Sequence, residues 1–178
     1  MRFLIAVLVS VALPALAQRA ENSGPPKDFA KGKGTGLVQL SPTDVNSMVN
    51  AEVSFQAESD PAGNNAKGVV HLRLPNRIEY QAVVTCLMVR STSLNLPDGT
   101  VLPGRFIGLS ADIVKRNDNI EGGTPLDGIR IVAVDSDRPE LFTDRLRVFL
   151  EFDSRPEHQC QAGPAAEDFD GDISSYDE

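Results

Sequence analysis

The sequence contains no tryptophan, and aromatic residues make up only 6% of its 178 residues. Valine, isoleucine, leucine and the eight phenylalanines must therefore supply the core, and a carbohydrate-binding face built on exposed aromatic side chains is disfavoured. The chain also lacks a basic stripe, because 25 Asp and Glu outweigh 17 Lys and Arg and give a net charge of −8. Nucleic-acid binding is therefore not supported.

Long apolar runs are absent except at the start of the chain. Phe3–Leu13 is apolar apart from one serine, follows Met1-Arg2, and ends before the small-residue sequence Ala15-Leu16-Ala17. This order is typical of a signal peptide over residues 1–17, cleaved between Ala17 and Gln18. The run is too short for a transmembrane helix, which needs about 20 residues. We expect a secreted protein, extracellular or periplasmic, with no membrane span in the mature form.

Removal of the signal peptide would leave a chain of the size of one domain, and loss of Arg2 would bring the net charge from −8 to −9. Residues 18–36 are rich in Gly, Pro, Lys and Asn without hydrophobic periodicity, which predicts a flexible leader. Residues 164–178 carry six acidic residues and no Lys or Arg, which predicts a disordered acidic tail. The single β domain is expected over residues 37–163.

Alternation of apolar and polar residues predicts β-strands along this domain. In the third predicted strand, residues 77–90, apolar residues occupy both the odd and the even positions. This indicates a strand covered on both faces or bent by a bulge near Val83-Val84. Residues 41–49 could begin a short helix, because Ser41-Pro42-Thr43-Asp44 resembles a helix start. Turn-forming clusters separate the strands, so we expect an antiparallel β-sandwich or small barrel. The predicted strands are 49–58, 68–74, 77–90, 106–115, 129–133 and 146–152.

Cysteine occurs only twice, at Cys86 and Cys160. Two cysteines in an exported protein indicate a disulfide, since its destination is oxidising. The alternative is a pair of free buried thiols. A metal site needs more ligands at close spacing, and only His158 lies near Cys160 in the sequence.

The acidic tail contains one weak candidate for a metal site. Asp168, Asp170 and Asp172 resemble a calcium-binding loop, because several carboxylate oxygens close together suit a hard cation. Gly171 falls at the fourth position instead of the sixth, and no glutamate follows at the twelfth. A disordered, solubilising terminus is therefore the favoured interpretation. No cofactor is predicted.

No motif for nucleophilic catalysis is present, and no catalytic residue is assigned. His71 lies on the polar parity of its strand and is expected to face solvent. Six aspartates lie in loops and at strand ends, where turn formation explains most of them. A hydrolytic pair among them would need two carboxylates close together in a cleft. These aspartates are Asp112, Asp118, Asp127, Asp135, Asp137 and Asp144.

Several segments in order resemble a loosely defined group of secreted, uncharacterised, mostly bacterial β-proteins. Their pattern includes Val-Thr-Cys-Leu-x-Val, a glycine-containing strand, a Val-x-Asp-Asn-Gly corner and a late cysteine. This chain carries the most specific part at Thr85, Cys86, Leu87 and Val89, and has Asp135-Ser136-Asp137 at the corner. The resemblance covers roughly residues 49–160. It implies the β fold and the cysteine pairing, and it transfers no catalytic residue.

These observations favour a secreted, non-catalytic binding or interaction module with an unknown partner and oligomeric state. One alternative is a small barrel that carries an apolar ligand, and the other is a hydrolase based on carboxylates. The carrier would need an internal cavity. Its expected lining residues are Phe55, Leu72, Tyr80, Ile107 and Ile131.

Overall fold

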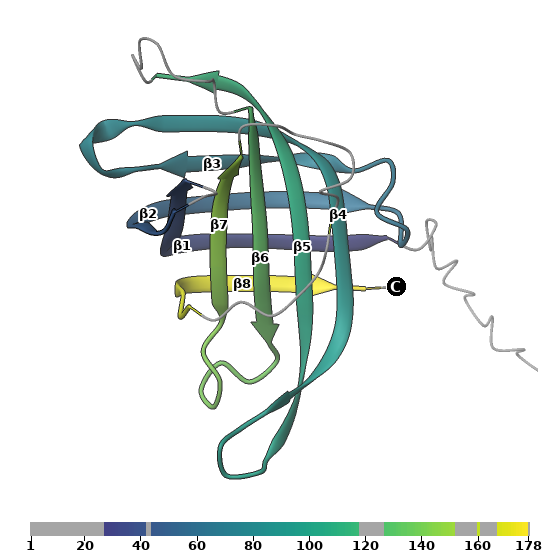
Figure 1. Cartoon of the computed structure of the whole chain (residues 1–178). Helices are drawn as coiled ribbons and strands as arrows, with labels where there is room; N and C mark the ends of the chain where they lie inside the picture. Colours follow the sequence, from purple (N-terminus) through teal and green to yellow (C-terminus); the bar gives the residue numbers. More distant parts are fainter. Residues whose placement is uncertain (1–26, 42–43, 118–126, 152–159, 161–166, 178) are drawn as a thin grey trace, which may run out of the picture.

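The computed structural model describes residues 27–41, 44–117, 127–151, 160 and 167–177 (Figure 1). The all-β prediction is confirmed, and none of the helices among these residues is long and apolar enough to cross a membrane. The expected signal peptide, its cleavage point and residues 18–26 lie outside the described residues. The elements are β1 (Asp28–Ser41), β2 (Asp44–Ser59), β3 (Lys67–Arg73), the 3-10 turn η1 (Pro75–Arg77), β4 (Glu79–Asn95), β5 (Val101–Arg116), β6 (Gly128–Ser136), β7 (Arg145–Glu151) and β8 (Asp170–Tyr176).

The strands form a closed ring with one additional strand. Neighbours pair in the order β2-β3-β4-β5-β6-β7-β1-β8, and a further β1–β2 pairing closes the first seven strands into the ring. Strand β8 attaches along β1. The pairing of Leu37–Gln39 in β1 with Arg147–Phe149 in β7 is parallel, and the other strand pairings described are antiparallel.

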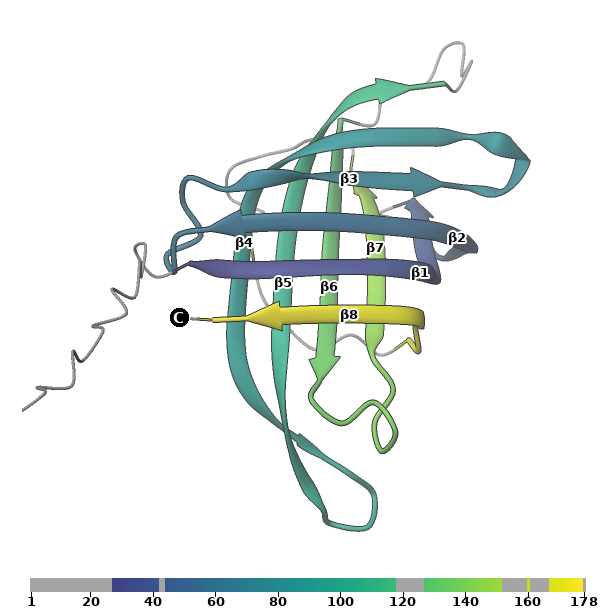
Figure 2. The same ribbon diagram turned by 180° about the vertical axis from the view of Figure 1, so that it is seen from behind.

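The ring is flattened into two layers whose strands cross (Figures 1 and 2). One layer contains β1, β2, β3 and β8, and the other contains β5, β6 and β7. Strand β4 curves from one layer into the other, because only its first part, Glu79–Val83, pairs with β3 whereas it pairs with β5 over nearly its whole length. The core lies between the layers. Each strand contributes every second residue to it, as expected for a half-buried strand.

A β-bulge in β4 changes which side chains face the core, from even-numbered residues before it to odd-numbered residues after it. Ala82 and Val84 are buried in its first half, whereas Leu87 and Val89 are buried in its second half. The pairing with β5 shifts register between Val84 and Cys86. An inserted residue reverses which side chains face inward, so the predicted bulge explains the mixed apolar pattern.

The predicted flexible leader is wrong from residue 28 onward, because this part of the chain forms most of β1. The glycines hide the strand pattern: Gly32, Gly34 and Gly36 take the inward positions of the strand. A Cβ atom on Gly32 would lie 2.5 Å from the Phe55 ring, and one on Gly36 would lie 2.8 Å from Leu146. Large side chains from neighbouring strands thus fill the space that these glycines leave.

The predicted disordered tail is also wrong over Asp170–Tyr176, which forms β8. This strand pairs with β1 in an antiparallel ladder that places Gly171 opposite Gly34. Phe169 and Ile173 point inward and are 2% and 3% exposed. The acidic residues take the alternate, outward positions of an ordinary amphipathic strand.

The predicted helix over residues 41–49 is wrong as well. Strand β2 begins at Asp44 and continues without interruption to Ser59. Val49 pairs with Val38, and Met48 pairs with Gln39, in the long hairpin of β1 and β2. Pairing with a complete neighbouring strand outweighs a local helix start signal, since strand formation depends mainly on tertiary context.

Candidate functional site

The outward face of β1, β2 and β3 carries three adjoining pockets of about 530, 390 and 330 Å³. Lys33, Ser54 and His71 line both the first and the second pocket. Gln56 and Val69 line both the second and the third. The three pockets therefore form one open groove along β2, which we call the outer-face groove. Each volume lies in the lower part of the range of small-molecule sites, about 300–1,000 Å³.

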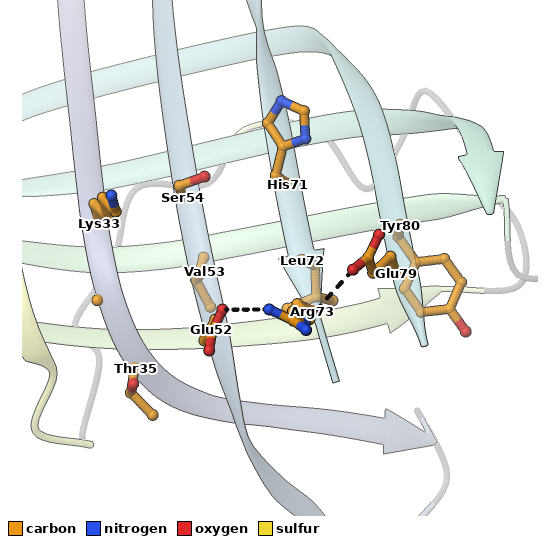
Figure 3. Close-up of a pocket in the computed structure, with 11 residues that line it drawn as sticks. Lys33, Thr35, Glu52, Val53, Ser54, His71, Leu72, Arg73, Glu79 and Tyr80 are labelled. Atoms are coloured by element: carbon orange, nitrogen blue, oxygen red, sulfur yellow. Dashed lines mark ion pairs between the residues drawn. The ribbon is translucent and has the colours of Figure 1, made fainter. Parts of the chain in front are cut away.

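The strand register builds this groove from four rows of side chains. Outward residues alternate along each strand, so the rows from Glu52 to Glu58 extend over roughly 20 Å of β2. Figure 3 shows the first two rows, with Lys33, Ser54 and His71 side by side on three strands. The rows are Thr35, Glu52 and Arg73; Lys33, Ser54 and His71; Lys31, Gln56 and Val69; and Phe29, Glu58 and Lys67.

Ion pairs are present at both ends of the groove. Arg73 lies between Glu52 and Glu79, with N···O distances of 3.6 and 3.5 Å (Figure 3). At the other end, Lys27 pairs with Glu58 at 3.3 Å. All of these side chains are largely exposed, so the ion pairs add little stability. The charges at the ends do not cancel, because Arg73 with two glutamates leaves one negative charge at the first end. Lys27 and Lys67 with Glu58 leave one positive charge at the other.

The middle of the groove carries excess positive charge. Within the described part of the chain, neither Lys31 nor Lys33 has a carboxylate within 4.0 Å. Asp172 of β8, opposite Lys33 in the ladder, is the carboxylate that lines the same pocket. His71, Ser54 and Gln56 add neutral hydrogen-bonding groups. Two ammonium groups thus lie above a polar floor on a protein whose net charge is −8.

An aromatic pair flanks the third pocket. The rings of Phe29 on β1 and Tyr176 on β8 stack with centroids 5.1 Å apart. Tyr176 remains 46% exposed, and Phe29 lines the pocket. The groove therefore combines cations in its middle with an accessible aromatic surface at one end.

Two of the aspartates considered for hydrolysis, Asp135 and Asp144, bind the edge of β8 that does not pair with β1. Asp135 accepts hydrogen bonds from the backbone N–H and hydroxyl of Ser175, at 2.7 and 2.6 Å. Asp144 accepts bonds from the backbone N–H groups of Ile173 and Ser136, at 2.9 and 3.0 Å. Both carboxylates are buried, and burial raises the pKa of each above its ordinary value.

Two more aspartates bind the uncovered edge of β4 in the same way. Asp28 accepts a bond from the backbone N–H of Val89 at 2.9 Å, and burial raises its pKa. Asp177 accepts bonds from the N–H and hydroxyl of Ser91. Its hydrogen bonds to Ser91, aided by the Arg105 charge, outweigh desolvation and lower its pKa. These carboxylates cap backbone donors that no neighbouring strand reaches.

The remaining carboxylate candidates are scattered. Asp137 binds Arg105 at 2.7 Å beside Asp135, so three of the six aspartates come near one corner. Asp112 is exposed on β5, Asp127 precedes β6, and Asp118 lies outside the described residues. Because Asp135 and Asp144 hold backbone donors, the geometry provides no specific support for a hydrolytic pair.

The calcium candidates lie along an extended segment and do not converge. Asp170 and Asp172 are two residues apart on β8, which separates their backbone positions by roughly 7 Å. Asp168 forms an ion pair with Arg145 at 3.5 Å. Among the described residues there is no group of three or more His, Cys, Asp or Glu that could hold a metal ion.

The predicted disulfide is present. Cys86 of β4 is bonded to Cys160, with a Cα–Cα distance of 5.7 Å within the normal range for a disulfide. The five residues proposed to line a cavity for an apolar ligand are at most 4% exposed and belong to one core cluster, and two of them, Leu72 and Tyr80, also line the first pocket. His71 faces outward as predicted, and His158 lies outside the described residues.

The groove lysines were not among the predicted site residues, because they fell in the segment expected to be a flexible leader. The available signal was the alternation Lys31-Gly32-Lys33-Gly34-Thr35-Gly36, which has the period of a strand with one polar and one glycine face. Comparison with protein-family models, with curated proteins and with solved structures finds no match for this chain.

Proposed function

We propose that this protein is a secreted, non-catalytic binding module and that its ligand lies in the outer-face groove. The continuity of the three pockets along β2 is the observation on which this proposal depends. A groove on the rigid face of a closed ring is preorganised, because the strands beneath it are paired on both sides.

Two other observations support the module over the alternatives. The interior positions proposed for an apolar ligand are occupied by packed side chains. The carboxylates proposed for hydrolysis bind backbone donors of β8. The groove side chains carry no nucleophile paired with a base, but they do provide many hydrogen-bond donors and acceptors.

Export follows from the expected signal peptide, and the Cys86–Cys160 bond is compatible with an oxidising compartment. Mass spectrometry of the exported protein is expected to give Gln18 as its first residue. Recovery of the full chain, starting at Met1, from the cytoplasm alone would contradict export.

Amide NMR of the ¹⁵N-labelled protein tests the site. We would titrate it with short oligomers of galacturonic acid, glucose and glutamic acid. At least one series is expected to shift the amides of Lys31–Thr35, Ser54 and His71 together. Shifts confined to the other layer, or hydrolysis of the oligomers during the titration, would contradict the proposed function.

A further inference from the structure

The ligand that matches the outer-face groove carries negative charge, and we propose that it is an acidic polysaccharide. This inference rests on the proposed function and specifies the chemistry of the same site. The middle of the groove offers two ammonium groups, one imidazole and several small polar groups, and an aromatic pair lies at one end. Each of these matches a different part of an acidic sugar chain.

The charged groups select an anion. Lys31 and Lys33 stand two residues apart on β1, so their backbone positions are separated by roughly 7 Å along the groove. They face Gln56 and Ser54, respectively, on β2. The first end carries one excess negative charge, whereas Lys31 and Lys33 exceed Asp172 by one positive charge in the middle and Lys67 adds another in the last row. The groove therefore attracts anions to its middle and far end.

The polar groups select a ligand rich in hydroxyls. Ser54, Gln56, Thr35 and His71 present donors and acceptors along the groove in neighbouring rows. A sugar chain offers several hydroxyls on every ring to such groups. The roughly 20 Å length of the groove suits a chain of linked rings better than a single small ion.

The aromatic pair supplies an apolar surface. The Phe29–Tyr176 stack lies at the third pocket, in the last of the four rows. The apolar face of a sugar ring can pack on an exposed aromatic ring, while the polar groups of the ligand bind the middle of the groove. Among the residues that the structure describes, Tyr176 is the aromatic side chain in the exposed class, which makes this pair the stacking position.

An acidic peptide fits less well. Extended peptides gain affinity mainly by adding to the edge of a sheet, but β2 is an interior strand paired on both sides. The uncovered backbone donors of β8 and β4 at 173, 175, 89 and 91 are already bound by aspartates. A peptide would therefore depend on side-chain contacts alone.

Calorimetric titration with four hexamers tests the proposal. Hexagalacturonate carries carboxylates only, a heparin hexasaccharide carries both carboxylates and sulfates, maltohexaose is a neutral sugar, and hexaglutamate is an acidic peptide. At least one acidic sugar is expected to bind more than tenfold tighter than maltohexaose and hexaglutamate, and added salt should weaken this binding. Comparison of the two acidic sugars shows whether sulfate groups strengthen binding beyond that of carboxylates alone.

Matched variants locate the binding. Lys31→Ala with Lys33→Ala is expected to weaken the preferred acidic sugar about tenfold or more, and Tyr176→Ala is expected to weaken it severalfold. Lys115→Ala is the control, because it removes an exposed lysine from β5, outside the groove. All replaced side chains are exposed, so each variant is expected to fold, which circular dichroism would verify.

The outcomes separate the two proposals. If maltohexaose or hexaglutamate binds as tightly as the acidic sugars and shifts the groove amides, the polysaccharide inference is wrong and the groove remains the binding site. If neither acidic sugar binds, the inference is also wrong. If an acidic sugar binds but the groove substitutions have no more effect than Lys115→Ala, the groove is not the site and the proposed function fails.

Discussion

At the scale of single residues, glycine at three inward positions of β1 lets the side chains of other strands fill the core. Gly34 is the tightest of these positions, because a Cβ atom there would lie 2.3 Å from the carbonyl oxygen of Asp170 and 2.5 Å from the Cα of Gly171. Both distances are far shorter than real side chains tolerate. The outward lysines between these glycines therefore lie on a strand whose inner face has no room for a side chain larger than that of glycine.

Replacement of Gly34 by alanine is expected to destabilise the protein by about 1–3 kcal/mol, because β8 must move away from β1. Urea unfolding measures the change. Thr35→Ala is the control, since it alters the outward face of the same strand and is expected to cost within about 0.5 kcal/mol. Equal stability of the Gly34 and Thr35 variants would show that β8 does not approach β1 as described.

The buried aspartates give the protein a defined pH dependence. Burial raises the pKa of Asp28, Asp135 and Asp144 above the ordinary value of 3.8, so the folded state binds these protons more tightly than the unfolded chain. Their contribution to the free energy of unfolding is complete below pH 3.8 and is lost as the pH rises through the folded-state pKa values. This contribution should therefore increase between pH 7 and pH 4.

Two substitutions of Asp135 separate its charge from its hydrogen bonds. Asp135→Asn keeps an oxygen for Ser175 and removes the titrating group, so we expect stability at pH 7 at or above wild type and a weaker pH dependence. Asp135→Ala leaves the Ser175 donors without this acceptor and is expected to cost about 1–3 kcal/mol. Denaturation at pH 7, 5 and 4 provides the comparison. A larger loss for asparagine than for alanine would contradict this role.

At the scale of the elements, β8 completes the core of the first layer. It supplies Ile173 to the central cluster, directly follows the buried Phe169, pairs with β1 over its whole length, and has its outer edge bound by Asp135 and Asp144. The strand also carries Asp172 and Tyr176, which border the groove. The C-terminal strand is thus part of both the fold and the proposed site.

Phe169→Ala is expected to reduce the free energy of unfolding by about 3–5 kcal/mol, because it removes a fully buried ring that lies against Gly34 and Gly171. Asp170→Ala, at the next and exposed position, is the control and is expected to change stability by no more than about 0.5 kcal/mol. A small effect of the Phe169 substitution would mean that the C-terminal segment is a dispensable tail.

The sequence allowed prediction of strands whose inward positions hold large apolar residues. All six predicted strands correspond to β2–β7, and the bulge near Val83-Val84 is where the register shifts. The strands β1 and β8 were missed because glycine takes the inward positions of one and acidic residues take the outward positions of the other. Their partners come from distant parts of the chain, so no local pattern showed that Lys31 or Lys33 would lie beside Gln56, Ser54 and His71.

At the scale of the whole molecule, the Cys86–Cys160 bond joins residues 74 positions apart and closes a long loop that includes β5, β6 and β7. Such a cross-link restricts the unfolded chain and is expected to contribute about 2–4 kcal/mol. Urea unfolding with and without reductant measures this contribution. The double variant Cys86→Ser and Cys160→Ser should be insensitive to reductant. An unchanged unfolding midpoint of reduced wild type would contradict a stabilising disulfide.

The central claim is that the outer-face groove, with Lys31 and Lys33 in its middle, binds an acidic ligand. Protection of individual lysines from acetylation tests it most directly, with mass spectrometry reporting the rate at each site. Saturating hexagalacturonate or heparin hexasaccharide is expected to slow modification of Lys31 and Lys33 severalfold and to leave Lys115 unchanged. Equal rates at Lys31 and Lys33 with and without either acidic sugar would contradict the claim.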